Sequence, residues 1–234
     1  MQEQTSGDWP LERMLGRTTS AAYFDAATGE WTAMRAALHE NIINAMMAGK
    51  MTKATPKLWI VMGGAGTGKS TLIKSKLVPE QPSAVLIDAD QMWTVIPEYE
   101  ALAAADWSTV GDRTYAELRY LRDAALAEAA TRRLDIIFET SGDENLGELI
   151  NILKRDDYKV SLNCLDCPVE QARERMMERA NRAPTPEDNL WCSQPSPEFP
   201  DKYDYQNVDP EVFRRQYAKR KGRAQSPERP ERTP

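Results

Sequence analysis

The fold is decided by residues 63–72, GGAGTGKSTL, which directly follow the short apolar run LWIVM at residues 58–62. The first eight of these residues fit the pattern G-x-x-x-x-G-K-[ST]. An apolar run of this length that stops at a glycine is typical of a buried parallel strand, and the residues behind the lysine can open a helix. A strand, a glycine-rich loop and a helix in this order predict a P-loop, which binds the phosphates of a nucleoside triphosphate.

Each residue type in this loop has a chemical reason to be there. Glycines let the backbone turn its N–H groups inward, and the start of a helix adds partial positive charge. We expect Lys69 to reach the β and γ phosphates and Ser70 to ligate Mg²⁺. A glycine turn that only packs would leave this lysine crowded and without a partner. The predicted site for ATP or GTP comprises Gly63, Gly64, Ala65, Gly66, Thr67, Gly68, Lys69, Ser70 and Thr71.

Segments with strand and helix patterns alternate along the rest of the chain. This order predicts an α/β fold of the P-loop NTPase or kinase type, with a parallel sheet of about five strands. Helices should cover both faces, because parallel neighbours need crossover connections. After the first strand we predict strands within residues 83–90, 134–140, 158–165 and 201–207, and helices within residues 114–133, 144–157, 168–182 and 209–220.

The chain divides into a central P-loop domain and two flanking segments. Residues 1–55 are predicted to form a helical extension, because residues 31–50 carry apolar side chains at helical spacing. The P-loop domain spans residues 56–222 and includes a lid over about 173–200, whose second half is rich in proline and has no regular period. Residues 223–234 are basic and proline-rich, so we predict a disordered tail.

Composition argues against several classes of partner. The chain has 234 residues and a formal net charge of −6, which does not favour a surface built for nucleic acid. No apolar run approaches the roughly 18 residues that span a membrane, and the first residues do not resemble a secretion signal. We therefore expect a cytoplasmic protein without membrane contact.

The three cysteines are an odd number, which argues against a disulfide framework. Cys164 and Cys167 have the spacing of half a zinc site, but His39 is the only histidine and Cys192 alone would not complete a tetrahedral set. Packing at the end of a strand is therefore the favoured interpretation of Cys164 and Cys167.

Two acidic residues follow the second predicted strand. Asp88 and Asp90 stand at its carboxyl end, the edge at which parallel sheets collect their ligands. We predict that Asp90 is the general base that takes the proton of an acceptor hydroxyl, and that Asp88 binds substrate. A solvated loop acid or a helix N-cap is the alternative for either residue.

A third acidic residue ends the next predicted strand. Glu139 is placed to hold Mg²⁺, directly or through water, beside Ser70. Thr140 and Ser141 follow at once and are candidates for substrate contact. Capping of the strand end is the alternative for these residues.

Arginines crowd the predicted helix within residues 168–182. Arg175, Arg179 and Arg182 recur at helical spacing and share a face, while Arg173 sits beside the apolar face. Interleaved glutamates are compatible with an ordinary surface helix. A kinase, however, needs cations that stabilise charge on the transferred phosphoryl group, and Arg182, next to the proline-rich lid, is the main candidate.

Taken together, these stretches resemble the zeta-toxin family of P-loop kinases. The resemblance covers roughly residues 31–207 and lies in the order and spacing of several motifs. They are RAALHENIINAM at 35–46, PKLWIVMGGAGTGKSTL at 56–72, AVLIDADQMWTVIPEYEAL at 84–102, DIIFETSG at 135–142 and NRAPTP at 181–186.

The resemblance implies phosphorylation of a sugar hydroxyl on a nucleotide-linked substrate, with ATP or GTP and Mg²⁺. A UDP-N-acetyl amino sugar is the first expectation for the substrate and NAD the second, and an antitoxin protein is an expected partner. By position, the resemblance implies that Asp90 is the base and that Glu139 binds substrate or orders the site. It also implies that Arg182, together with Arg173, Arg175 or Arg179, acts on the γ-phosphate.

Two other functions remain open from the sequence. A polynucleotide 5′-hydroxyl kinase would use the same loop and a similar acid, although the chain shows no aromatic and basic stripe for a single strand. A nucleotide-gated binding protein without catalysis would also keep the loop. Around His39, ordinary packing is favoured over a cover for the site or a docking surface for an antitoxin.

Overall fold

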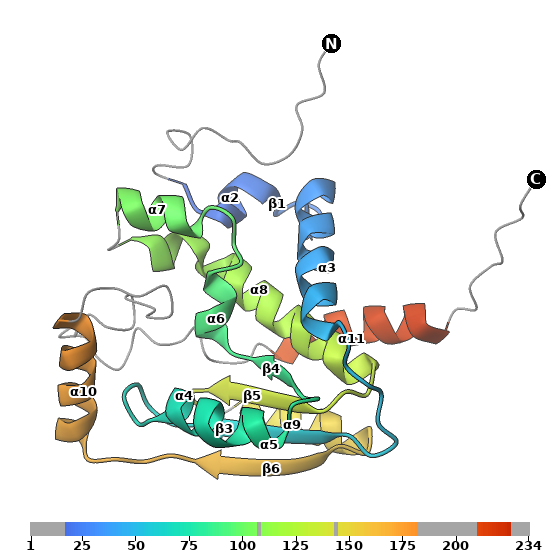
Figure 1. Cartoon of the computed structure of the whole chain (residues 1–234). Coiled ribbons are helices and arrows are strands. Elements are labelled where there is room, and N and C mark those ends of the chain that lie inside the picture. Colours follow the sequence, from blue (N-terminus) through green and yellow to red (C-terminus); the bar gives the residue numbers. More distant parts are fainter. Residues whose placement is uncertain (1–16, 107–108, 143–144, 182–209, 226–234) are drawn as a thin grey trace, which may run out of the picture.

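The computed structural model describes residues 17–106, 109–142, 145–181 and 210–225. A parallel sheet of four strands lies at the centre of this part of the chain, in the order β4-β5-β3-β6 (Figure 1). The strands are β3 (Lys57–Met62), β4 (Val85–Ile87), β5 (Ile136–Thr140) and β6 (Lys159–Cys164). The predicted parallel α/β fold is confirmed.

Helices connect the strands. The P-loop leads into one helical run made of α4 (Lys69–Leu72), the π-helical turn η1 (Ile73–Leu77) and α5 (Val78–Glu80). The others after the loop are α6 (Ala89–Trp93), α7 (Tyr99–Ala105), α8 (Val110–Thr131), α9 (Leu146–Arg155), α10 (Val169–Asn181) and α11 (Pro210–Gln225). Helices α8 to α11 correspond to the four that the sequence predicts. Among the described helices, none has the length and apolar character needed to cross a membrane.

Side chains of the P-loop strand β3 alternate between two cores. Leu58 and Ile60 are fully buried in the larger core, which includes residues from α6, α8, α9 and α11. Val61 belongs to a smaller core together with Ile73 and Leu77 of the helical run behind the loop. Because successive residues of a strand point to opposite faces, helices cover both faces of the sheet, as predicted.

The sheet has fewer described strands than expected. About five were predicted, and four are present in the described ranges. The fifth, predicted within residues 201–207, lies outside the described residues. Strand β4 has only three residues instead of about five, because Asp88 begins a helix by capping α6 directly behind Ile87.

The amino-terminal extension is helical only in part. It comprises α2 (Thr19–Tyr23), the short antiparallel strands β1 (Phe24–Asp25) and β2 (Glu30–Trp31), and α3 (Ala33–Met47). Helix α3 agrees with the helix that residues 31–50 predict, and it packs against α8. The hairpin was not predicted, because two-residue strands are too short to show a period of two.

Helix α11 corrects the predicted boundary of the tail. It continues to Gln225, three residues into the segment that was expected to be disordered. Phe213 and Tyr217 of α11 are buried where this helix packs against α8. Arg220 is only 4% exposed, and Glu40 and Glu128 neutralise its charge. An arginine of a basic helix can therefore be buried when carboxylates of neighbouring helices match its charge. Residues 226–234 lie outside the described residues.

Candidate active site

The P-loop connects β3 to α4, as the sequence predicts, and two glycines take conformations that other residues rarely adopt. Gly66 has φ +76° and Gly68 has φ +99°, both in the left-handed region. Gly68 is the N-cap of α4, so the turn ends where the first free N–H groups of the helix begin. The backbone thus presents the start of a helix at the carboxyl end of β3, the geometry that suits a phosphate.

Lys69 lies inside this loop and is almost fully buried. Its Nζ donates hydrogen bonds to the carbonyl oxygens of Gly63 at 2.9 Å and Gly64 at 3.1 Å. Thr67 closes the same loop by donating to the Gly64 carbonyl at 2.8 Å. A cation is therefore held at the loop, within reach of any phosphate that binds there.

The strand order brings the acidic residues to the same edge. Strand β5 pairs with both β3 and β4, with Val61 opposite Glu139 and Ile87 opposite Phe138. Glu139 therefore lies between the P-loop and Asp88, which follows Ile87. Its Oε1 is 3.7 Å from Lys69 Nζ.

Glu139 is buried and incompletely satisfied. It is 4% exposed, and its Oε2 atom has no hydrogen-bond partner within the described residues. Burial, followed by the charges of Asp88 and Asp90, raises the pKa of Glu139 well above its usual range. A buried carboxylate oxygen without a partner is costly, so this atom is suited to a bound water, cation or substrate hydroxyl.

Asp88 and Asp90 differ in their surroundings. Asp88 is 6% exposed and caps α6, its Oδ1 accepting a hydrogen bond from the Asp90 backbone N–H at 2.9 Å. Burial and the nearby charge of Asp90 raise the pKa of Asp88. Asp90 is half-buried in the first turn of α6. The N-cap alternative thus holds for Asp88, and the capping bond fixes the backbone of Asp90.

Thr140 and Ser141 end β5 behind Glu139. Thr140 is 1% exposed, and its Oγ1 accepts a hydrogen bond from Gly142 N–H at 3.2 Å. This bond is the strand-end capping that the sequence left open as an alternative. Ser141 is half-buried.

Helix α10 packs directly on the loop. A Cβ on Gly66 would lie 2.6 Å from the carbonyl oxygen of Ala172. Arg175 Nη1 donates to the Gly66 carbonyl at 3.0 Å. One of the predicted arginines therefore contacts the loop, while Arg173 is exposed on the same helix.

The other two predicted arginines are not placed. Arg179 belongs to α10, but its side chain lies outside the described part of the structure, and so does the whole of Arg182. The contact between the backbone of Ala172 and the P-loop was not predicted from the sequence. The sequence does place this alanine on the apolar face of an otherwise charged helix, a pattern that indicates packing against the rest of the fold.

The cysteines do not add to the site. Cys164 is exposed at the end of β6, so the predicted packing is wrong for this residue, and Cys167 is half-buried. Cys192 lies outside the described residues. Within the described ranges, no group of three or more histidine, cysteine, aspartate or glutamate side chains is arranged to hold a metal ion.

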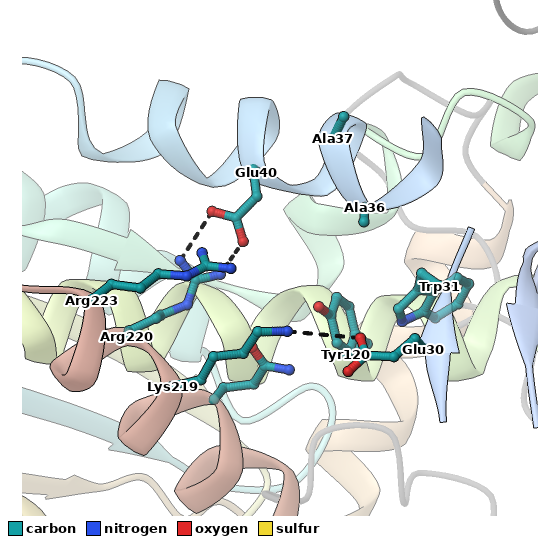
Figure 2. A pocket seen from close by; sticks show the side chains of 10 residues that line it. Glu30, Trp31, Ala36, Ala37, Glu40, Tyr120, Lys219, Arg220 and Arg223 are labelled. Carbon is teal, nitrogen blue, oxygen red and sulfur yellow. Dashed lines mark hydrogen bonds and ion pairs between the residues drawn. The ribbon is translucent and has the colours of Figure 1, made fainter. Parts of the chain in front are cut away.

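A pocket of about 170 Å³ lies elsewhere, between α3, α8 and α11. Figure 2 shows Glu40 of α3 joined to Arg220 of α11, and Lys219 joined to Glu30. Both glutamates of this pocket are thus paired with basic side chains of α11. None of the predicted site residues lines it, and the P-loop edge remains the candidate active site.

Comparison with known proteins agrees with this fold. Residues 43–190, well over half of the chain, match the family model described as Zeta toxin. No curated protein sequence matches the chain.

Solved structures with the same fold are distant in sequence. One, from the PezAT chromosomal toxin–antitoxin system of Streptococcus pneumoniae, has 19% identity and a TM-score of 0.55, covering 64% of this chain and 63% of that chain. A chain of the AvrRxo1-ORF1:AvrRxo1-ORF2 complex with sulphate ions has 17% identity and a TM-score of 0.54, covering 74% and 61%. The same complex with ATP gives a TM-score of 0.55 at the same identity and coverage.

The chain spans less than two thirds of the length of these solved chains. At this identity they show the fold, a P-loop kinase fold, and the family match shows the relationship. This chain belongs to the zeta-toxin family.

Proposed function

We propose that the protein is an ATP-dependent kinase that phosphorylates a hydroxyl group of a small molecule. The observation that carries this proposal is the buried P-loop lysine beside a buried carboxylate, with Lys69 Nζ 3.7 Å from Glu139 Oε1, and with Asp88 and Asp90 behind the neighbouring strand at the same edge of the sheet. A phosphate site alone would also serve a switch or a motor. Acids beside it supply the groups that a phosphoryl acceptor needs.

The residues around the loop suit a nucleotide with Mg²⁺. Three carboxylates outnumber the one buried lysine, and the free Oε2 of Glu139 and the hydroxyl of Ser70 are oxygen ligands of the kind Mg²⁺ prefers. Mg²⁺ usually keeps several waters and binds phosphates, so no complete cage of protein ligands is required. When bound, the ion would neutralise charge on the β and γ phosphates.

Lys69, the loop and α10 would bind the triphosphate. Backbone N–H groups at the start of α4 would hold the phosphates, and Lys69 would exchange its bonds to Gly63 and Gly64 for phosphate oxygens. Arg175 already contacts the loop, which supports a role for it at the γ-phosphate. Arg182 remains the second candidate.

Asp90 would act as the general base. Its carboxylate would take the proton of the acceptor hydroxyl as that oxygen bonds to the γ-phosphorus, and the bond from this phosphorus to the bridging oxygen of ADP would break. Glu139 and Asp88 would orient the acceptor hydroxyl or its neighbours. The hydrogen bond from Asp90 N–H to Asp88 keeps the base at the head of α6.

For the acceptor we propose a sugar hydroxyl of a nucleotide-linked molecule, a UDP-N-acetyl amino sugar before NAD. Membership of the zeta-toxin family supports this class. An antitoxin protein is a proposed partner, since one of the similar solved structures comes from a toxin–antitoxin system.

The test is transfer of label from γ-labelled ATP with Mg²⁺ to UDP-N-acetylglucosamine, UDP-N-acetylmuramic acid, NAD and a 5′-hydroxyl oligonucleotide. Asp90→Asn is compared with Asp112→Asn, which changes an exposed aspartate of α8. We expect label on a nucleotide-linked sugar, lost only in Asp90→Asn. Label on the oligonucleotide would assign a polynucleotide kinase, and ATP binding without any transfer would overturn the kinase proposal for these acceptors.

A further inference from the structure

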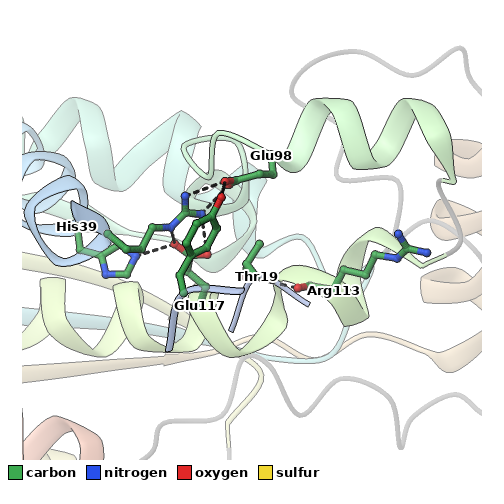
Figure 3. Close-up of polar contacts among 7 residues, drawn as sticks. Thr19, His39, Glu98, Arg113 and Glu117 are labelled. Carbon is green, nitrogen blue, oxygen red and sulfur yellow. Dashed lines mark hydrogen bonds and ion pairs between the residues drawn. The ribbon is translucent and has the colours of Figure 1, made fainter. Parts of the chain in front are cut away.

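A buried arginine from the amino-terminal extension joins three parts of the molecule. Arg35 of α3 is 5% exposed. Its guanidinium donates to Glu117 of α8 at 2.6 and 2.8 Å and to Glu98 at 2.8 and 2.6 Å. Both contacts are two-pronged, the geometry in which an arginine binds carboxylates most specifically (Figure 3).

Neighbouring side chains complete this network. Tyr23 donates its hydroxyl to Glu98 at 3.0 Å, and the Arg35 guanidinium stacks 4.3 Å from the centre of the Tyr23 ring. His39 Nε2 lies 2.6 Å from Glu117 and is 1% exposed, so ordinary packing is the correct interpretation of this histidine. Burial acts to raise the pKa of Glu117, but hydrogen bonds from His39 and Arg35 hold it below its usual value.

Glu98 links the network to the acidic side of the active site. It lies in the connection between α6, which carries Asp90, and α7, which starts at Tyr99. Trp93, the last residue of α6, is fully buried, and its ring stacks on that of Tyr99 at a centroid distance of 6.4 Å. The position of α6 relative to the rest of the fold therefore depends on how this connection is held.

The residues that bind Glu98 and Glu117 lie outside the part of the chain that matches the family model. The family match starts at residue 43, whereas Tyr23, Arg35 and His39 precede it. The core shared with the family supplies Glu98 and Glu117. Without Arg35, two largely buried carboxylates would lose the cation that they share, which is unfavourable.

We infer that Arg35 is a positioning residue: through Glu98 it fixes the segment from Asp88 to Glu98 and so sets where the base meets the acceptor. The catalytic half of this inference rests on the proposed function. Arg35 does not touch the reacting groups, and acts through the α6–α7 connection. The amino-terminal extension is then a brace for the acceptor side, and the nucleotide side is independent of it.

The chain offers a matched control. Arg220 of α11 is also a buried arginine held by two glutamates, Glu40 and Glu128. The side chain of Glu128 is 12% exposed and that of Glu98 is 11% exposed. Glu98→Gln and Glu128→Gln therefore remove one charge from equally exposed glutamates that each bind a buried arginine, and only the first network reaches the α6–α7 connection.

The first measurement is steady-state phosphate transfer by the full chain to the acceptor found above. We expect Glu98→Gln to lower kcat/KM for the acceptor by about tenfold or more, since small misplacements of reacting groups have large effects. KM for ATP should stay unchanged, and Glu128→Gln should keep both values. Arg35→Lys should behave like Glu98→Gln, because an ammonium group cannot bridge two carboxylates in a planar fork. Equal effects of Glu98→Gln and Glu128→Gln would overturn the inference.

The second measurement does not depend on catalysis. Hydrogen exchange of backbone amides in residues 89–105 should be at least several-fold faster in Glu98→Gln than in the native chain, and unchanged in Glu128→Gln. Unchanged exchange in Glu98→Gln would overturn the brace itself. If the native chain transfers no phosphate, the proposed function fails, and faster exchange in Glu98→Gln alone would still establish the brace.

Discussion

At the scale of single residues, the pKa of Glu139 depends on its burial and on the other carboxylates of the site. Its pKa is raised to about 8, and that of Asp88 to about 7, chiefly by burial and then by neighbouring carboxylates. Both values exceed the ordinary carboxyl values of about 4. These two carboxyl groups therefore bind more protons in the folded chain than in the unfolded chain between about pH 4 and pH 8.

This difference predicts that stability falls as pH rises. Folding is favoured most at the acid end of the window, and for each extra proton that the folded state holds, the free energy of unfolding falls by up to about 1.4 kcal/mol per pH unit. Glu139→Gln removes one such group, so its stability should depend less on pH and exceed that of the native chain at pH 8. Urea unfolding at pH 5.5, 6.5, 7.5 and 8.5, without nucleotide, measures the slopes.

Glu100→Gln is the control for this prediction, since Glu100 is exposed on α7. Its pH dependence should equal that of the native chain. Identical slopes for Glu139→Gln and the native chain would contradict the prediction, and would mean that Glu139 is as easily ionised in the folded chain as in the unfolded one.

At the scale of elements, the contact between the P-loop and α10 depends on the absence of a side chain. Gly66→Ala would place a methyl group 2.6 Å from the Ala172 carbonyl in a left-handed backbone. We expect a loss of about 1–3 kcal/mol in stability from the strained backbone and a weaker affinity for ATP as α10 shifts. Urea unfolding and calorimetric titration with ATP measure the two effects.

A second glycine provides the comparison. Gly147 in α9 has open space where a Cβ would be added, so Gly147→Ala should stabilise the chain by about 0.5–1 kcal/mol and leave ATP affinity unchanged. A Gly66→Ala variant with native ATP affinity would show that α10 does not restrain the loop.

Helix α11 gives a further prediction at this scale. Arg220→Met removes the buried guanidinium that bonds both Glu40 and Glu128 and leaves Glu128 with Arg132 alone, so we expect the chain to lose about 1–3 kcal/mol of stability. Arg223→Met changes an exposed residue of the same helix and should stay within about 0.5 kcal/mol of the native value. Thermal unfolding of both variants is the measurement, and equal midpoints would mean that α11 is not part of the folded unit.

The sequence predicted some elements well and others not at all. Strand β3, the P-loop and helices α8 and α9 have the length, apolar period or glycine spacing that physical rules recognise. Helices α6 and α7 have five and seven residues, too few to establish a period. The end of α11 was missed because its burial depends on Glu40 and Glu128, which are distant in sequence.

At the scale of the whole molecule, the site arises from strand order, which no local pattern reveals. Strand β5 follows β4 in the chain but inserts between β4 and β3, so Glu139 comes to lie beside Lys69. The sequence placed Asp88, Asp90 and Glu139 at strand ends, which was enough to predict a common edge. It could not predict that Glu139 is buried between the P-loop and Asp88. Nor could it predict that Arg35 of α3 binds Glu98 in the connection between α6 and α7.

Because β3, α4 and α10 all meet at the P-loop, a ligand bound there should stabilise the entire fold. Mg²⁺ and ATP at about one hundred times the dissociation constant should add roughly 2.7 kcal/mol to the free energy of unfolding. AMP should add much less, since Lys69 is expected to bind the β and γ phosphates that AMP lacks. Lys69→Met should abolish most of the ATP effect and keep a folded chain. Thermal unfolding with each ligand is the measurement. An equal shift with AMP, or a full ATP shift in Lys69→Met, would contradict binding of the triphosphate at this loop. Either result would mean that stabilisation by ATP does not depend on contacts between Lys69 and the β and γ phosphates.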